Sequence, residues 1–324
     1  MFLLLDLTAG NIPYHFAGTI ANSMVDLTGD YETSVRVDYS KPNLLSASAS
    51  FLNLPVSIMG TSVIASLDTD FSYSTQDGFN VNLNRFELEE AGNTIRFKPH
   101  LALGGKINGY GAHFDSIVYS DLFSELDGTA DIFFALEDSV LESAGIKIQM
   151  KNPLSEESVL INLDASNPDR LPLGLDAIMN SFYLDASVVA NNLDMNRFST
   201  VNSSNNVLTG SVYLTGTLEQ PYVSAGLDNF SLLVSGDVMR MSGSAIMENR
   251  EVTLNDFIFD LGSTKIDQVS GNFDLSSFTG VLLANINADF IEESIHMPVK
   301  LELKDPVKKE GGFMPSAFTL NLIT

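Results

Sequence analysis

Apolar and polar residues alternate one by one along most of the chain. The clearest stretch is 205–290, where Val212 and Leu214 alternate with Ser211 and Tyr213. Alternation with a period of two predicts a β-strand that has one apolar face. Similar stripes follow one another with only short turns between them, which leaves no room for crossover helices. The pattern therefore predicts an antiparallel β-meander.

Turn signals divide the rest of the chain into short strands. Gly29-Asp30, Lys41-Pro42-Asn43 and Gln76-Asp77-Gly78 have the residues that turns require. In the clearest stretch, turns are expected at 226–230 and 235–237. At one strand per about 8–12 residues, the whole chain would hold roughly 30 strands.

Three segments interrupt the alternation and predict short helical turns. They are 120–126, 173–180 and 193–199, where apolar residues recur at helical spacing. We interpret them as caps on a sheet, because none is long enough to form a helical layer.

A weak internal repeat supports a repetitive architecture. The segment Val81-Asn-Leu83-Asn-Arg-Phe86 aligns with Val252-Thr-Leu254-Asn-Asp-Phe257. Chance agreement between two strands of similar composition is the alternative explanation.

Composition excludes several classes of partner and site. The 324 residues include 41 acidic and 17 basic side chains, a formal net charge of -24, which repels nucleic acid and anionic lipid headgroups. Only 18% of the residues are charged and the mean hydropathy is +0.12, so the protein is apolar for its acidity. Cysteine is absent, which excludes disulfides and thiolate metal sites.

The sequence predicts no catalysis, no metal site and no cofactor. The four histidines (His15, His100, His113, His296) are scattered, without the spacing of a metal motif. No nucleophile elbow, phosphate-binding loop or dinucleotide fingerprint occurs. Adjacent carboxylates such as Glu89-Glu90 would point to opposite faces of a strand and make a poor acid–base pair.

The apolar stripe can be either buried in a closed core or left partly exposed. In a β-sandwich or β-solenoid it packs into a closed core, as expected of a structural or adhesin array. In one long sheet it stays partly open, and a large uncovered apolar patch usually marks a binding surface. Alternation alone does not distinguish the two.

Several segments together resemble a known family. They are Leu184-Asp-Ala186-Ser-Val188, Leu208-Thr-Gly210-Ser-Val212-Tyr-Leu214-Thr-Gly216-Thr217, Gln220-Pro221, Val269-Ser-Gly271-Asn-Phe-Asp-Leu275 and Met297-Pro298-Val299. Their order and composition resemble the repeating unit of the TamB/AsmA-like proteins of diderm bacterial envelopes. The resemblance covers 173–304 well and 1–172 only in style.

The resemblance implies a fold and a role. The fold is all-β: a long, repetitive antiparallel sheet curled into an open apolar groove (a β-taco or gutter), with a few short helical turns. We expect a segment at 1–172 and a TamB-like segment at 173–324, continuous with each other. The role is that of a bridge-like lipid transfer protein of the cell envelope, a periplasmic conduit for phospholipids between inner and outer membranes.

The implied partners follow from that role. They are phospholipid acyl chains, an outer-membrane barrel partner and an inner-membrane anchor outside this segment, and nucleic acid is not among them. We therefore expect the chain to be a piece of a longer protein. No catalytic residue is carried over from the family.

One parity of each strand is expected to line the groove. The expected lining residues are Leu184, Ala186, Val188, Val212, Leu214, Phe230, Leu232, Val234, Phe257, Phe259, Phe273, Leu275, Leu282, Ala284 and Ile286.

Overall fold

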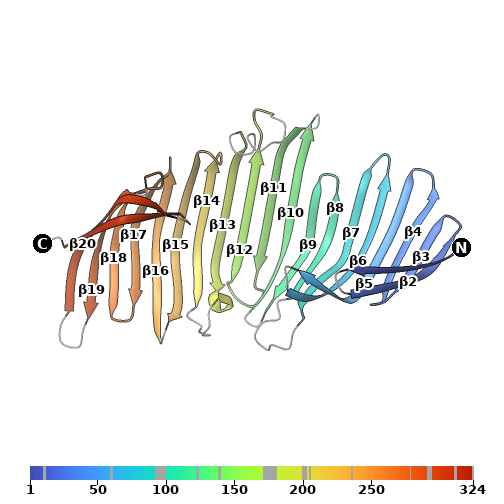
Figure 1. Ribbon diagram of the computed structural model, residues 1–324, viewed down its shortest axis with the longest axis horizontal. Helices are drawn as coiled ribbons and strands as arrows, with labels where there is room; N and C mark the ends of the chain where they lie inside the picture. The colour runs from blue at the N-terminus through green and yellow to red at the C-terminus, as the bar shows by residue number, and fades with distance from the viewer. Residues whose placement is uncertain are drawn as a thin grey trace. The chain divides into compact units, whose positions relative to one another are not determined.

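The computed structural model of the protein describes most of the chain. The described residues are 1–9, 12–58, 61–91, 100–121, 124–137, 140–170, 181–198, 203, 206–234, 236–277, 279–289, 294–309 and 312–322. Within them the protein is all-β: 21 strands belong to one open antiparallel sheet (Figure 1). The helical structure described is one 3₁₀ turn, η1 (Met195–Phe198). The all-β prediction is confirmed.

The chain forms two compact units. Unit 1 comprises Met1–Ala135 and Gly145–Ser155, and unit 2 comprises Leu136–Ala144 and Glu156–Thr324. The expected boundary near residue 172 lies outside the described residues and stays a prediction.

Unit 1 is built from strands β1 to β9, most of β10 and the second half of β11, while the end of β10 and the start of β11 belong to unit 2. Their bounds are β1 Phe2–Ala9, β2 Ile12–Ala21, β3 Met24–Gly29, β4 Thr33–Lys41, β5 Leu44–Ile58, β6 Thr61–Ser74, β7 Gly78–Glu90, β8 His100–Asn108, β9 Gly111–Ser120, β10 Glu125–Glu137 and β11 Val140–Lys151. From β1 to β10, every strand pairs with the next one in the chain.

Unit 2 is likewise a meander. Its strands are β12 Ser158–Ser166, β13 Tyr183–Asp194, β14 Val207–Gly216, β15 Pro221–Val234, β16 Asp237–Glu248, β17 Glu251–Leu261, β18 Thr264–Asp274, β19 Thr279–Asp289, β20 Ser294–Lys309 and β21 Gly312–Leu322. From β12 to β21, each strand again pairs antiparallel with the next.

The strand register of unit 2 separates an apolar face from a polar one. Ala186, Leu214 and Val223 lie opposite one another on neighbouring strands, and directly opposed residues share a face. On the other face, Ser187 lies opposite Tyr213. We call these two sides the apolar face and the polar face of unit 2. Alternation in the sequence thus becomes a two-sided sheet.

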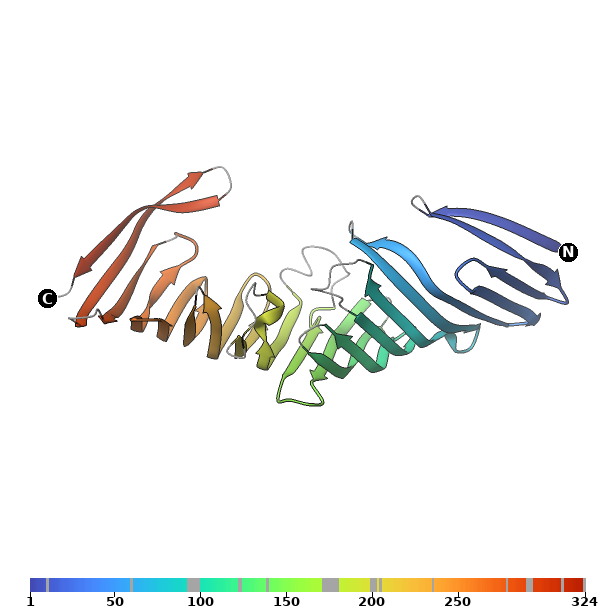
Figure 2. The same cartoon turned by 90° about the horizontal axis from the view of Figure 1, so that it is seen from below.

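The sheet of unit 2 is a single layer over much of its length. Figure 2 shows its yellow and orange strands side by side, with the red strands β20 and β21 rising out of that layer. In Figure 1 the same two strands cross in front of β17 and β18. The end of unit 2 therefore bends away from the plane of its middle strands.

Few hydrophobic side chains are fully buried in the described part of the chain. They are Ala65, Ile117, Leu126, Ala130, Phe182, Ala190 and Val299. On the apolar face of unit 2, Val188 and Val212 lie opposite each other and are 42% and 44% exposed. The described strands form one sheet, so the sandwich alternative lacks a second sheet to cover this face.

Bulges recur in unit 2, on β13, β15 and β17 and also on β18, where Gln268 has a φ of 53°. One extra residue interrupts the register of β13 after Ala190, of β15 after Leu227 and of β17 after Leu254. Asn192 and Asp256, at two of these places, have φ angles of 45° and 51°. Asn and Asp tolerate this left-handed conformation better than most residues do. Each bulge shifts the parity of the strand, so that apolar residues on both sides of it reach the same face.

We expect Asp256→Val to destabilise the protein by about 1–2 kcal/mol, because a β-branched residue fits poorly at a left-handed φ. Asp256→Gly should cost less, since glycine adopts this φ freely. Urea unfolding followed by circular dichroism measures the difference. The control is Asn272→Val, an exposed position on the neighbouring strand β18. Equal losses from the two valine variants would contradict the assignment of strain to the bulge.

The two copies of the internal repeat each form a bulged strand, one in each unit. Val81–Phe86 lies in β7, whose register shifts between Leu83 and Phe86, and Val252–Phe257 lies in β17, whose register shifts between Leu254 and Phe257. The repeated sequence therefore encodes a strand that changes parity midway.

Several local predictions need correction. The described residues form 21 strands, whereas roughly 30 were expected of the chain, because bulges join segments that look separate in the sequence. The expected turn at 226–230 is the bulged middle of β15, whereas the turn at 235–237 does separate β15 from β16.

The helical predictions have mixed outcomes. Segment 193–199 contains η1, which supports that prediction in part. Segment 120–126 is not helical in its described residues, since Ser120 ends β9 and Glu125 begins β10. Segment 173–180 lies outside the described residues.

Candidate functional site

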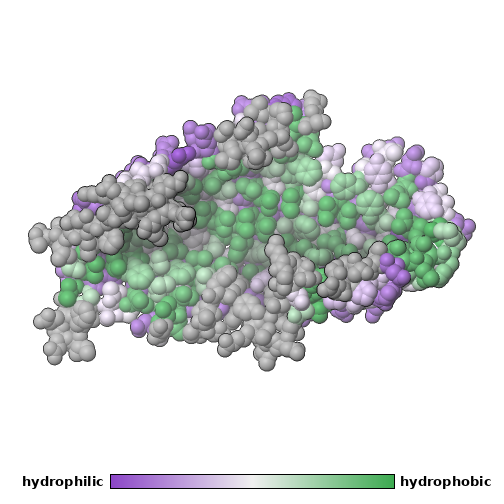
Figure 3. All heavy atoms as spheres, viewed as in Figure 1, coloured by the Kyte–Doolittle hydropathy of each residue, from purple (hydrophilic) through white to green (hydrophobic). Residues whose placement is uncertain are grey.

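Two adjoining hollows lie on the apolar face of unit 2. Hollow 1 extends over β13–β17 and has a volume of about 270 Å³. Hollow 2 extends over β16–β20 and has a volume of about 350 Å³. Figure 3 shows hydrophobic side chains gathered over the middle strands of unit 2, on the side that Figure 1 presents.

Small residues create hollow 1. Ala190, Gly210, Leu227 and Gly243 lie opposite one another on successive strands, so three of the four positions carry little or no side chain. Larger side chains stand on either side of this row. The lining of hollow 1 is Val188, Ala190, Leu208, Gly210, Ser211, Val212, Ala225, Gly226, Leu227, Gly243 and Phe257.

Larger apolar side chains surround hollow 2. Phe259 lies opposite both Met241 and Ile266, and Ile286 lies opposite Ile266, so four strands contribute to one apolar row. The lining of hollow 2 is Met241, Leu254, Phe257, Ile258, Phe259, Ile266, Val269, Leu282, Ala284, Ile286, Val299 and Leu301.

Neither lining includes a titratable residue. Ser211 is the one polar residue in the two linings, and the register places its side chain on the polar face. The hollows therefore offer non-directional apolar contact, with neither a counter-charge nor a general acid or base.

The expected lining residues share one face, with one exception. Strand register places Leu184, Ala186, Val188, Val212, Leu214, Phe230, Leu232, Val234, Phe257, Phe259, Phe273, Leu282, Ala284 and Ile286 on the apolar face. Leu275 instead lies in the turn after β18, where its backbone N–H donates to the carbonyl oxygen of Arg250 at 2.8 Å.

The hollows bring together only some of these residues. Val188 and Val212 line hollow 1, and Phe259, Leu282, Ala284 and Ile286 line hollow 2, while Phe257 lines both. The other predicted positions lie on the same face outside the hollows.

The sequence prediction missed several residues that line the hollows. Ala225 and Leu227 precede the bulge of β15, and Leu254 precedes that of β17. Their parity differs from that of the residues after each bulge, so a single parity per strand could not include both sets. Asp228-Asn229 and Asn255-Asp256, polar pairs between two apolar stripes, are the signal that locates the bulges.

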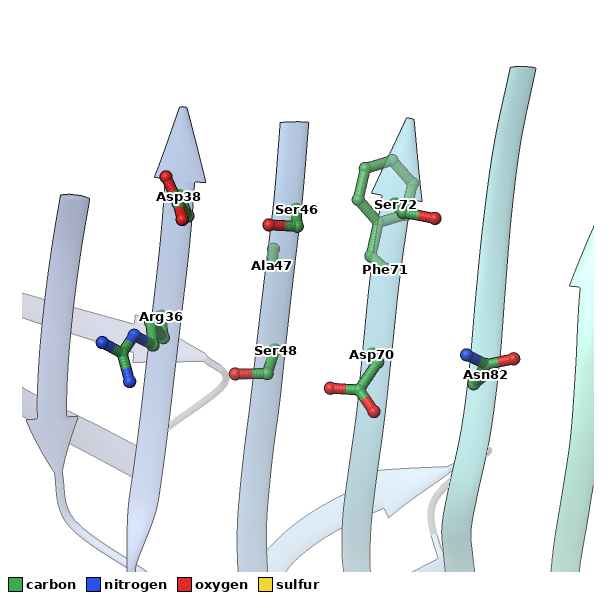
Figure 4. A pocket seen from close by; sticks show the side chains of 9 residues that line it. All are labelled: Arg36, Asp38, Ser46, Ala47, Ser48, Asp70, Phe71, Ser72 and Asn82. Carbon is green, nitrogen blue, oxygen red and sulfur yellow. The ribbon is translucent and has the colours of Figure 1, made fainter. Parts of the chain in front are cut away.

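Unit 1 carries a hollow of a different kind. It has a volume of about 330 Å³ and lies over β4–β7. Figure 4 shows the side chains of Arg36, Ser48, Asp70 and Asn82 in one row across these four strands, as the register also requires. The row is polar, and its charges pair across strands: Arg36 Nε lies 3.4 Å from a carboxylate oxygen of Asp26. Such exposed pairs chiefly support strand register.

Three of the five described groups with shifted pKa values are His15, Asp38 and Asp274. The carboxylate of Asp6, 2.8 Å from Nδ1 of His15, raises the pKa of that histidine. Hydrogen bonds from Ser40 lower the pKa of Asp38. The backbone N–H of Ser276, 2.7 Å from Asp274, lowers the pKa of that carboxyl group. None of the three groups is buried, which is typical of turns and strand pairing rather than of a catalytic centre.

The described residues contain no group of three or more His, Cys, Asp or Glu side chains that could hold a metal ion. No helix in the described part of the chain is long and apolar enough to cross a membrane.

A cluster of buried amides closes one end of β13–β15. Asn206 is 1% exposed, and its Nδ2 donates to Oδ1 of Asn196 at 2.7 Å. Oδ1 of Asn206 accepts from the backbone N–H of Leu233 at 2.7 Å. Asn196 lies in η1, so the cluster ties this turn to β14 and β15. No pattern in the sequence predicts this cluster.

No protein-family model, curated protein or solved structure matches the chain.

Proposed function

We propose that the apolar face of unit 2 binds the acyl chains of phospholipids, and that the protein is a periplasmic conduit carrying phospholipids between the inner and outer membranes of a diderm bacterium. The observation that carries this proposal is the pair of hollows on a face that no second sheet covers among the described residues. In the proposed state, the sheet curls around the acyl chains as an open apolar groove.

The energetics of an apolar face favour such a ligand. Removing apolar surface from water contributes roughly 25 cal/mol per Å². An acyl chain gains this contribution without a hydrogen bond or a counter-charge, which matches linings without titratable residues. Because these contacts are non-directional, a chain can also slide along the face. Met241, in hollow 2, adds a flexible contact.

The route between two membranes rests on the resemblance of 173–304 to the TamB/AsmA-like proteins. The meander of unit 2 supports it, because each added hairpin lengthens the apolar face across the strands. An outer-membrane barrel partner and an inner-membrane anchor belong to the same proposal. The net charge of -24 makes anionic headgroups unfavourable close to the protein, so acyl chains are the expected point of contact.

Site-specific photo-crosslinking tests lipid binding. A photoreactive amino acid at Leu214, expressed in the periplasm of a diderm host, should capture phospholipid that mass spectrometry identifies. The matched control is Tyr213, the preceding residue of β14, which lies on the polar face and is 48% exposed. Capture at Tyr213 equal to that at Leu214, or at neither position, would contradict the proposal. Capture of protein alone at Leu214 would favour a structural array.

A further inference from the structure

Phe257 is the residue that hollows 1 and 2 have in common. Hollow 1 lies over β13–β17 and hollow 2 over β16–β20, and Phe257 belongs to β17, where the two meet. A molecule that extends along the apolar face from one hollow into the other must therefore pass this side chain.

Two features of the backbone fix Phe257 at that place. The first is the bulge at Asp256, because residues three apart in a regular strand lie on opposite faces, and the bulge brings Leu254 and Phe257 to the same face. The second is Gly243 on the neighbouring strand β16, whose φ is 145°. A Cβ atom at Gly243 would lie 2.6 Å from Cγ of Phe257 and 2.7 Å from its Cα, so the aromatic ring occupies the space that glycine leaves free.

The hollows have the size and chemistry of separate positions for hydrocarbon. An apolar cavity of about 150 Å³ accommodates a benzene-sized molecule. At about 270 and 350 Å³, each hollow holds a segment of an acyl chain rather than a whole phospholipid. A peptide occupant would need partners for its backbone N–H and C=O groups, which linings with a single polar residue do not supply. Hydrocarbon needs none.

We propose that Phe257 divides the apolar face of unit 2 into two acyl-chain positions and disfavours chains long enough to occupy both. This inference rests on the proposed binding of acyl chains and adds a residue that sets chain-length preference. A short chain lies within one hollow and leaves the ring in place. A long chain reaches the second hollow only by displacing the ring from Gly243.

The test compares two neutral probes on the full chain. Monodecanoylglycerol and monooctadecanoylglycerol differ in chain length alone, and their affinities are measured by displacement of a fluorescent monoacylglycerol. The readout is the affinity for the long probe divided by that for the short probe. In Phe257→Ala this ratio should rise about tenfold over the wild-type value, because the ring no longer has to move. In Phe257→Trp the ratio should fall.

Tyr213→Ala is the control, because Tyr213 lies on the polar face, outside both hollows. It removes an aromatic ring without changing either hollow, so the ratio should stay at the wild-type value. If Phe257→Ala fails to fold, Phe257→Trp still tests the role of Phe257, because it should lower the ratio of the two affinities. A ratio that is unchanged in the folded Phe257 variants overturns the role of Phe257 and leaves acyl-chain binding intact. If neither probe binds the wild-type protein, the proposed function and this inference are both overturned.

Discussion

Leu282→Glu is expected to abolish binding of acyl chains while leaving the sheet folded. Leu282 lines hollow 2 and lies opposite Gly271 on β18 and Leu301 on β20. A carboxylate there can reach water while the face is empty, but a bound acyl chain would strip that water away. Desolvating an unpaired charge costs several kcal/mol, so affinity should fall by a factor of about 100 or more.

The next residue provides the matched control. Leu283 is on the polar face, opposite Ser270 and Lys300, and is 43% exposed. Leu283→Glu inserts the same charge one position along the same strand and should leave binding unchanged. Binding is measured with the fluorescent monoacylglycerol, and folding by circular dichroism. If Leu282→Glu unfolds and Leu283→Glu does not, this face is packed as a closed core, which contradicts the proposed function.

Asn206→Leu is expected to lower the free energy of unfolding by about 2–4 kcal/mol, since it removes two buried hydrogen bonds and leaves the backbone N–H of Leu233 without its acceptor. The urea midpoint should fall. Hydrogen exchange at the amide of Leu233 should accelerate, which a loss of stability elsewhere in the chain would not produce selectively.

Two further variants separate the hydrogen bonds from general effects of substitution. Asn206→Asp keeps an acceptor for Leu233 but loses the donor to Asn196, so its stability should be intermediate. Asn229→Leu places leucine at an exposed position of β15 and should change stability little. If Asn229→Leu destabilises as much as Asn206→Leu, the buried amide cluster has no special role.

Alternation along the sequence was sufficient to predict the class of fold, because a strand with one apolar face has a period that a helix does not share. Turn chemistry was sufficient at Gly29-Asp30, 42–43 and 75–77, where strands do end. At Asp228 the same reasoning failed, since a polar residue between two apolar stripes resembles a turn. The distinction depends on whether the neighbouring strands continue past it, which is a property of the sheet and not of the segment.

The candidate site was predictable in part, because alternation along a strand also assigns its residues to one face of the sheet. One parity per strand identifies Leu282, Ala284 and Ile286, because β19 has no bulge between them. It omits Ala225 and Leu254, which precede bulges in their strands. The amide of Asn206 was not predictable from the sequence, because its partners in η1 and β15 come from both sides of it along the chain.

The bulges of β13, β15 and β17 have a consequence for how such a protein can grow during evolution. These strands run in the same direction, and the strands between them run in the other. Inserting one strand would reverse every strand after it relative to those before it, so bulged strands on the two sides of the insertion would run in opposite directions. Inserting a complete hairpin preserves both direction and parity. The natural increment of length is therefore a hairpin, and related proteins of different length should differ by an even number of strands.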